Sequence, residues 1–237
     1  MKLKNKNILI IALVFLLIDV SYTTNAGQKI KTGNGKIIPF SSLSFLDIGS
    51  ATKTGSTTIK EDELTIVAGG ADIWGTHDEF RFAYKMVKGD FDISLQILSL
   101  SATNLYTKAG IMARTDLSDN CQHVYFQVFP DNSPRNHNNG GCELQYRLVK
   151  GGEMKAIYPD VATAGHKFEV AFPKIWIRLK RTGNVFESYF SSDNINWILY
   201  STFTTELPEK LFLGIAVTAH DGNKQTTAGF GTLRLKN

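Results

Sequence analysis

Apolar and polar residues alternate along most of the chain after residue 45. The segment 90–97 is the clearest case: every second residue from Phe91 to Ile97 is apolar, and the residues between them are polar or charged. The segments 80–84, 123–129 and 175–180 have the same period of two. Because successive side chains of a strand point to opposite faces of a sheet, this period predicts strands with one buried face.

Other apolar segments of strand length follow the same arrangement. We expect further strands at residues 63–68, 108–114, 186–191, 196–203, 211–219 and 227–235. Turn formers such as Thr182-Gly183-Asn184 and Ser192-Asp193-Asn194 separate apolar strands, as hairpin turns do. The sequence has no long amphipathic helical pattern and no internal repeat. About a dozen short strands in a chain of this length indicate an all-β fold, a sandwich or a barrel.

The first 26 residues have a different pattern. Three lysines, at positions 2, 4 and 6, precede an apolar run over 8–17, and Ala26 is a small residue at a cleavage position. This order is typical of a secretory signal peptide. The run is too short for a membrane span, which needs roughly 20 residues. We therefore expect a signal peptide at 1–26, a lead-in segment at 27–44, one domain at 45–237, and a secreted or periplasmic protein without a membrane span after cleavage.

The charge balance argues against nucleic acid as a partner. The formal net charge is +4, and loss of three lysines and Asp19 with the signal peptide lowers it to +2. No basic run occurs in the remaining chain. A mature chain of 211 residues, 237 less 26, suits a single domain with a large core.

The two cysteines, Cys121 and Cys142, could form a disulfide in an exported protein. The strands expected at 123–129 and 143–150 form a hairpin in which the two cysteines lie at opposite ends. Their separation would be roughly 25 Å along a strand, whereas a disulfide needs Cα atoms within about 7 Å. The hairpin and the disulfide are therefore alternatives, and the hairpin is favoured.

Several motifs in order along the chain resemble those of a known family. The first are the glycine-rich segment Gly69–Tyr84, Gly89-Asp90-Phe91 and Lys108–Arg114. Later matches are Trp176–Asn184, Ser191-Ser192-Asp193 with Trp197, Gly214–His220 and Ala228-Gly229-Phe230. With these the chain resembles concanavalin A-like domains of the "regulation of enolase protein 1-like" type over about residues 45–235. The resemblance implies a two-sheet antiparallel β-sandwich, a jelly roll with a concave face, of a kind that occurs as accessory modules beside glycosidases.

No recognisable catalytic set accompanies this resemblance. Glucanases of the superfamily use a Glu-x-Asp-x-x-Glu strand motif, which directs its carboxylates into the cleft. Here the carboxylates of 61–63 and of 78–79 are adjacent, and Asp90 and Asp92 alternate without a following Glu. Neither a Ser/His/Asp arrangement nor a clustered His/Cys metal site is visible. The sequence therefore predicts no catalytic residues.

Cofactors are not indicated either, although a structural calcium stays open. Aspartates at 72, 78, 90, 131 and 221 lie in or beside expected loops. Calcium takes six to eight oxygen ligands, and no contiguous loop of this chain supplies them. We therefore predict no cofactor and no metal ligand.

Three of the expected strands carry polar and aromatic side chains on one side, which suits a sugar. The candidate ligand-binding residues are Lys108, Arg114, His123, Tyr125, Gln127, Gln145 and Arg147 on these strands, with Trp74 in the glycine-rich loop. Tyr125 and Phe129 are expected to be exposed aromatics on this face. The alternatives are a plain solvated face, Trp74 as a loop plug, and Arg114 as a buried ion-pair partner of Asp90 or Asp92.

Three functions remain open from the sequence. The favoured one is an exported, non-catalytic module that binds a glycan or polysaccharide on its concave face. The second is a protein-interaction module of the periplasm or cell envelope. The third is a glycan-processing hydrolase with an unrecognised acid and base.

Overall fold

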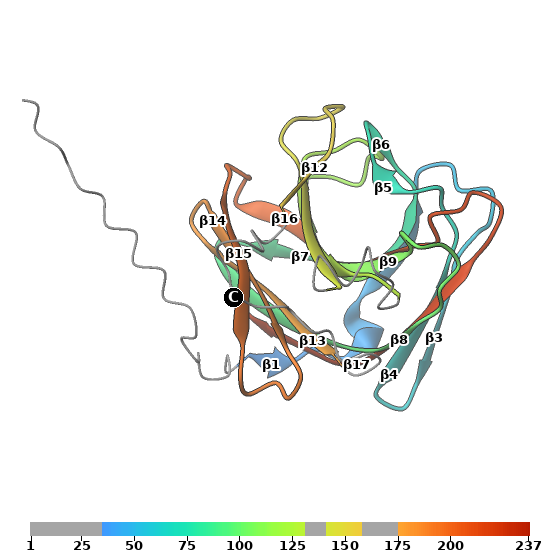
Figure 1. Ribbon diagram of the computed structural model, residues 1–237. Coiled ribbons are helices and arrows are strands. Elements are labelled where there is room, and N and C mark those ends of the chain that lie inside the picture. The colour runs from blue at the N-terminus through green and yellow to red at the C-terminus, as the bar shows by residue number, and fades with distance from the viewer. Residues whose placement is uncertain (1–34, 131–140, 158–174) are drawn as a thin grey trace, which may run out of the picture.

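The computed structural model describes residues 35–130, 141–157 and 175–237, which form two large antiparallel sheets. In Figure 1 strands β8, β13 and β17 lie on one side of β9, and β5, β6 and β12 lie on the other. The predicted all-β, two-sheet sandwich is confirmed. The expected signal peptide lies outside the described residues. Within the described ranges, no helix is long and apolar enough to span a membrane.

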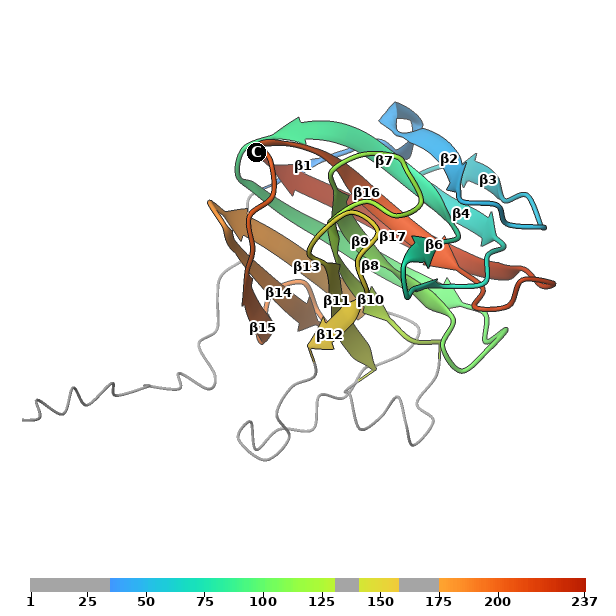
Figure 2. The same ribbon diagram turned by 90° about the horizontal axis from the view of Figure 1, so that it is seen from above.

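The eight-stranded sheet has β15 and β3 at its edges, which Figure 2 shows at opposite sides of the molecule. Its order is β15 (Ile198–Thr204), β14 (Val185–Ser191), β13 (Ile175–Thr182), β8 (Phe91–Leu100), β17 (Thr226–Lys236), β4 (Glu63–Ala68) and β3 (Ser56–Lys60), and β1 (Lys36–Ile37) pairs with β17. A short 3-10 helix, η1 (Phe40–Ser42), follows β1 and buries Phe40.

The seven-stranded sheet carries the face on which the candidate site was expected. Its order is β12 (Lys155–Ile157), β11 (Cys142–Arg147), β10 (His123–Val128), β9 (Lys108–Arg114), β16 (Lys210–Thr218), β7 (Phe80–Lys88) and β2 (Ser44–Ile48). The short hairpin of β5 (Ile73–Trp74) and β6 (His77–Asp78) belongs to neither sheet.

Every strand expected from the alternation is present, at nearly the expected bounds. The β10–β11 hairpin places Val128 opposite Cys142, while Cys121 lies beyond the other end of β10. Both thiols are buried and free. Strands β2 and β3 were not expected from the alternation. The segment expected as a lead-in contributes β1, η1 and the buried side chain of Leu43 to the fold.

The main core lies between the two sheets and is apolar throughout. It contains, among others, Leu95 and Ile97 of β8, Ile111 of β9, Phe126 of β10, Ile177 of β13 and Phe230 of β17. Each fully buried side chain of this size contributes about 1.5–3 kcal/mol relative to exposure. Leu95, Ile97, Phe126 and Ile177 are among the apolar positions that the period of two identified.

A second apolar cluster lies on the other face of the seven-stranded sheet. Its buried members are Ile48, Ile73, Phe80, Phe82, Met112, Tyr125, Met154 and Ala216. The prediction of one buried face is therefore wrong for β9 and β10, whose described residues are all buried. The physical reason is that the β5–β6 hairpin and the segment around Met154 cover this face.

Two glycines in the seven-stranded sheet permit close approach of neighbouring backbones. A Cβ atom on Gly214 would overlap the carbonyl oxygen of Ala83 on β7, and one on Gly110 would overlap that of Phe126 on β10. In each case the obstructing atom belongs to a paired strand, so a side chain could fit only if the strands moved apart.

We expect Gly214→Ala to lower the free energy of unfolding by about 1–3 kcal/mol, because the added methyl group overpacks the sheet. Urea denaturation measures the effect. Gly222→Ala is the matched control: the nearest neighbour of its added Cβ, the Cβ of Ala71, is 4.0 Å away. Equal stability of the two variants would contradict the close-approach explanation.

Candidate functional site

The strand register brings the predicted site residues together on one face. Arg114, His123 and Arg147 form one row across β9, β10 and β11. Met112, Tyr125 and Gln145 form the next row, and the third consists of Gly110, Gln127 and Glu143. Lys108 lies at the start of β9, so seven of the eight candidates share this face, with Trp74 in the hairpin above it.

The β5–β6 hairpin lies across this face and is hydrogen-bonded to it at both ends. Lys108 Nζ donates to the carbonyl oxygen of Ile73 at 3.2 Å, and Arg147 Nη2 donates to that of Gly75 at 3.0 Å. The N–H of Asp78 donates to the carbonyl oxygen of Asp119 at 2.7 Å. The hairpin therefore covers this face, and the candidate residues on the strands are buried beneath it or beside it.

The expectation of exposed aromatics on this face was wrong. Tyr125 and Phe129 are both fully buried. The Tyr125 hydroxyl donates to the carbonyl oxygen of Ala216 on β16 at 3.0 Å, which satisfies its polar end inside the apolar cluster. Burial raises the pKa of Tyr125 well above its ordinary value.

An ion cluster around Asp78 anchors one end of the hairpin. The Asp78 carboxylate accepts two hydrogen bonds from Arg147, both at 2.8 Å, in the bidentate geometry that suits arginine. Arg114 Nη2 lies 3.8 Å and His123 Nδ1 lies 3.6 Å from the same carboxylate. All four side chains are buried. A buried carboxylate needs such partners because its desolvation otherwise costs several kcal/mol.

Arg114 is a buried ion-pair partner, but of a different aspartate from those expected. It lies near Asp78 and also donates from Nε to the carbonyl oxygen of Asp116 at 2.8 Å. The expected partners belong to the other sheet: Asp92 pairs with Arg178, and Asp90 accepts a hydrogen bond from the N–H of Gly183.

A second polar chain runs under β5, the other strand of the hairpin. Lys108 Nζ donates to Asp72 Oδ1 at 2.6 Å and to Gln145 Oε1 at 3.5 Å. Gln145 Nε2 in turn donates to Glu143 Oε1 at 3.0 Å. Beside them the amide of Gln127 is buried, and neither of its polar atoms has a hydrogen-bond partner among the described residues. A buried amide without hydrogen-bond partners lowers the stability of the fold, so Gln127 differs from the hydrogen-bonded Gln145 beside it.

Five residues in contact with one another form what we call the rim cluster: Trp74, Lys108, Asp72, His220 and Tyr106. Lys108 Nζ lies 5.6 Å from the centre of the Trp74 ring, and His220 Nδ1 lies 3.0 Å from Asp72 Oδ2. The rings of His220 and Tyr106 are 5.1 Å apart. Trp74 is 40% exposed and Tyr106 is 37% exposed, so the cluster reaches solvent at both ends.

The neighbours of Asp72, the central carboxylate of the rim cluster, lower its pKa. Burial raises the pKa of Asp72, but the close contact with His220 and the charge of Lys108 outweigh this effect and the pKa is lowered. Asp72 therefore remains an acceptor that holds both basic side chains in place.

Trp74 and Lys108 were among the residues expected from the sequence, whereas Tyr106 and His220 were not. Both lie in loops next to paired strand ends, since Lys108 of β9 pairs with Thr218 of β16. Residues two positions outside such a pair lie close together, so knowledge of the strand order would have identified them.

The described residues place no metal site here. Among them, no group of three or more His, Cys, Asp or Glu side chains is arranged to hold a metal ion. The aspartates near the face have amino-acid partners instead, as Asp72 and Asp78 illustrate.

Comparison with known proteins identifies the fold. No protein-family model matches the chain, and no curated protein matches it by sequence. Among solved structures, a functionally unknown protein from Saccharomyces cerevisiae is 16% identical with a TM-score of 0.60, over 84% of this chain and 98% of that one. The carbohydrate-binding module CBM66 of Bacillus subtilis is 15% identical with a TM-score of 0.53, over 81% and 95%. This chain shares the two-sheet β-sandwich fold of these proteins.

A Bacillus licheniformis β-glucanase is also similar, with 12% identity and a TM-score of 0.51 over 87% of this chain and all of that one. The neighbours thus include both a binding module and an enzyme. At these identities the likeness concerns the fold alone, and function must be argued from the site.

We expect Asp78→Asn to lower the free energy of unfolding by about 3–5 kcal/mol, because it leaves two arginines buried without their counter-ion. Chemical denaturation measures the loss. Glu209→Gln is the matched control, because its pair with Lys88 is exposed and worth about 1 kcal/mol or less. A loss at Asp78 no larger than that of the control would show that the ion cluster does not anchor the hairpin.

His123 makes stability depend on pH. Burial lowers its pKa to about 4, and the charges of Arg114 and Arg147 act in the same direction. The unfolded chain, with a histidine pKa near 6.5, therefore takes up this proton first as the pH falls. The contribution of neutral His123 to stability is complete above about pH 6.5 and is lost towards pH 4, by up to about 1.4 kcal/mol per pH unit.

His123→Asn tests this assignment by removing the titrating group. We expect the free energy of unfolding to fall less between pH 7 and pH 4.5 in the variant than in the parent protein. Urea denaturation at both pH values measures the difference. The same loss in both proteins would mean that His123 is not the group responsible.

Proposed function

We propose that this protein is an exported, non-catalytic β-sandwich module that binds a carbohydrate at the rim cluster. The single observation that carries the proposal is the pair of exposed aromatic rings, Trp74 and Tyr106, at the two ends of a continuous chain of charged side chains. The proposal includes the resemblance to the "regulation of enolase protein 1-like" type and the signal peptide at 1–26, which would place the protein outside the cytoplasm.

The rim cluster has the chemistry that a sugar requires. Aromatic rings offer flat apolar surfaces for the C–H face of a pyranose or furanose ring, and Asp72 and His220 supply polar groups for its hydroxyls. Lys108 is buried beneath Trp74, and Asp72 joins it to His220. Because these contacts exist before a ligand arrives, binding would lose little side-chain entropy.

We assign the remaining candidates a supporting role. Arg114, His123 and Arg147 surround Asp78, and Tyr125 is bonded to the sheet backbone. In this proposal they hold the hairpin that presents Trp74 and do not contact the sugar. Gln127 and Gln145 lie next to the Lys108 end of the face, where they would extend the polar surface if the ligand reached deeper.

Relatives of the same fold support a glycan partner without deciding it. CBM66 is a carbohydrate-binding module by name, and the match with this chain covers 95% of its length. The protein would then serve a separate enzyme as an accessory module, or act alone as a lectin.

Affinity gel electrophoresis against a panel of plant, algal and host glycans tests the proposal. We expect at least one glycan to retard the purified protein. In that gel Trp74→Ala and Tyr106→Ala should each weaken binding about tenfold or more, equivalent to about 1.4 kcal/mol.

Trp176→Ala is the matched control, because this partly buried tryptophan lies on β13 of the other sheet. Its retardation should equal that of the parent protein, with melting temperatures showing that all variants fold. Retardation that survives Trp74→Ala, or no retardation of the folded protein by any glycan, would overturn the proposed site.

A further inference from the structure

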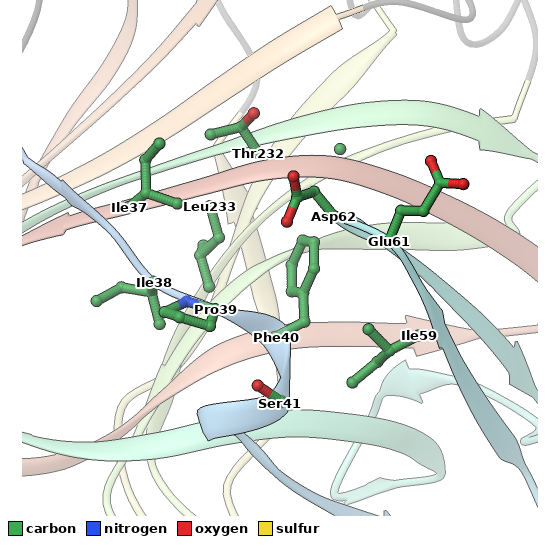
Figure 3. A pocket seen from close by; sticks show the side chains of 11 residues that line it. Ile37, Ile38, Pro39, Phe40, Ser41, Ile59, Glu61, Asp62, Thr232 and Leu233 are labelled. Carbon is green, nitrogen blue, oxygen red and sulfur yellow. The ribbon is translucent and has the colours of Figure 1, made fainter.

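A cavity of about 290 Å³ opens on the eight-stranded sheet, away from the rim cluster. Three parts of the chain form it: the segment from β1 into η1, the turn between β3 and β4, and the middle of β17. Figure 3 shows the Phe40 side chain of η1 between those of Ile59 and Leu233, with the turn residues Glu61 and Asp62 above it. Its volume is near the lower limit for small-molecule sites, about 300 Å³.

Six of the eleven residues that line this cavity are apolar, and part of that surface faces solvent. Phe40 and Leu233 are buried, and they also belong to the main core. Ile37 is 60% exposed and Ile59 is 39% exposed, so two large aliphatic side chains stand open at the entrance. Exposed apolar side chains at the mouth of a cavity can line a ligand site.

Two carboxylates lie at the same cavity. Glu61 and Asp62 form the two-residue turn between Lys60 and Glu63, which pair with each other. Both residues are exposed, and neither makes an ion pair or a side-chain hydrogen bond with any residue in the described ranges. The cavity therefore combines an apolar floor with two negative charges that the fold does not neutralise.

This combination selects one kind of ligand. A cation alone would bind the carboxylates but leave the apolar walls in water, and a neutral apolar group would leave the charges unpaired. An ammonium group on an aliphatic stem satisfies both, because the stem of a lysine buries its methylene groups while its charged end stays at the polar edge.

We propose that this pocket binds a lysine side chain of a partner polypeptide, whose flanking apolar residues pack against Ile37 and Ile59. The site is separate from the rim cluster and does not depend on carbohydrate binding. It would allow the module to hold a glycan on one side and a protein on the other.

NMR titration of the 15N-labelled protein tests the proposal with the peptide acetyl-Leu-Lys-Leu-amide. We expect saturable shifts of the backbone amides of Phe40, Glu61 and Asp62, with binding that weakens as salt is added. The same peptide with an N-ε-acetylated lysine should bind at least fivefold more weakly. Equal binding of the two peptides, or shifts confined to other parts of the protein, would overturn the proposal.

Variants of the turn separate binding from folding. Glu61→Gln and Asp62→Asn should each weaken binding of the peptide severalfold. Glu209→Gln, which changes an exposed carboxylate elsewhere, should not. Glu61 has a φ of 55°, which glycine adopts more easily. Glu61→Gly should therefore raise the urea midpoint of unfolding and at the same time weaken binding of the peptide.

Unchanged binding in the Glu61→Gln/Asp62→Asn double variant would refute the ionic part of the site. Concentration-dependent shifts of Phe40, Glu61 and Asp62 without peptide would show that a second copy of this chain occupies the pocket, and would overturn the assignment to a partner.

Discussion

The buried contact between Asp78 and Arg147 is the interaction on which the arrangement of the concave face depends. The two residues are far apart in the sequence, and their bidentate hydrogen bonds join the β5–β6 hairpin to β11. Removing either charge would leave the other buried without its partner, so this pair couples the stability of the hairpin to that of the sheet. With the hairpin in place, the face becomes a second buried layer, and Trp74 is held at its edge.

The period of two identified most strands correctly because one side chain in two packs into the main core. It also placed Lys108, Tyr125 and Gln145 on the same face, since the β9–β10–β11 register follows from the hairpin. The period of two could not predict the β5–β6 hairpin that covers that face. The strands β5 and β6 have two residues each, which is too short for any period, and their position depends on pairing with distant residues such as Asp119 and Arg147.

The candidate site was predictable to a similar, limited degree. Trp74 and Lys108 were identifiable from residue type and position, but Tyr106 and His220 become neighbours only through the pairing of β9 with β16. The pocket at Phe40 was not predictable because β1 and η1 lie in a Lys/Gly/Ser-rich segment without alternation. Edge strands with polar residues, such as β3, are also hard to recognise in the sequence. Only part of their surface is buried, so their apolar residues do not alternate regularly with polar ones.

We propose that the buried sheet face holds the β5–β6 hairpin and that a ligand contacts only the rim cluster. The chain has three tryptophans, so the indole N–H signals in an NMR spectrum report on three separate places. We predict that titration with a glycan retained in the binding screen shifts the indole signal of Trp74 and leaves those of Trp176 and Trp197 in place. A glycan that binds without moving the Trp74 signal, or that moves the signals of the other two, would contradict the account.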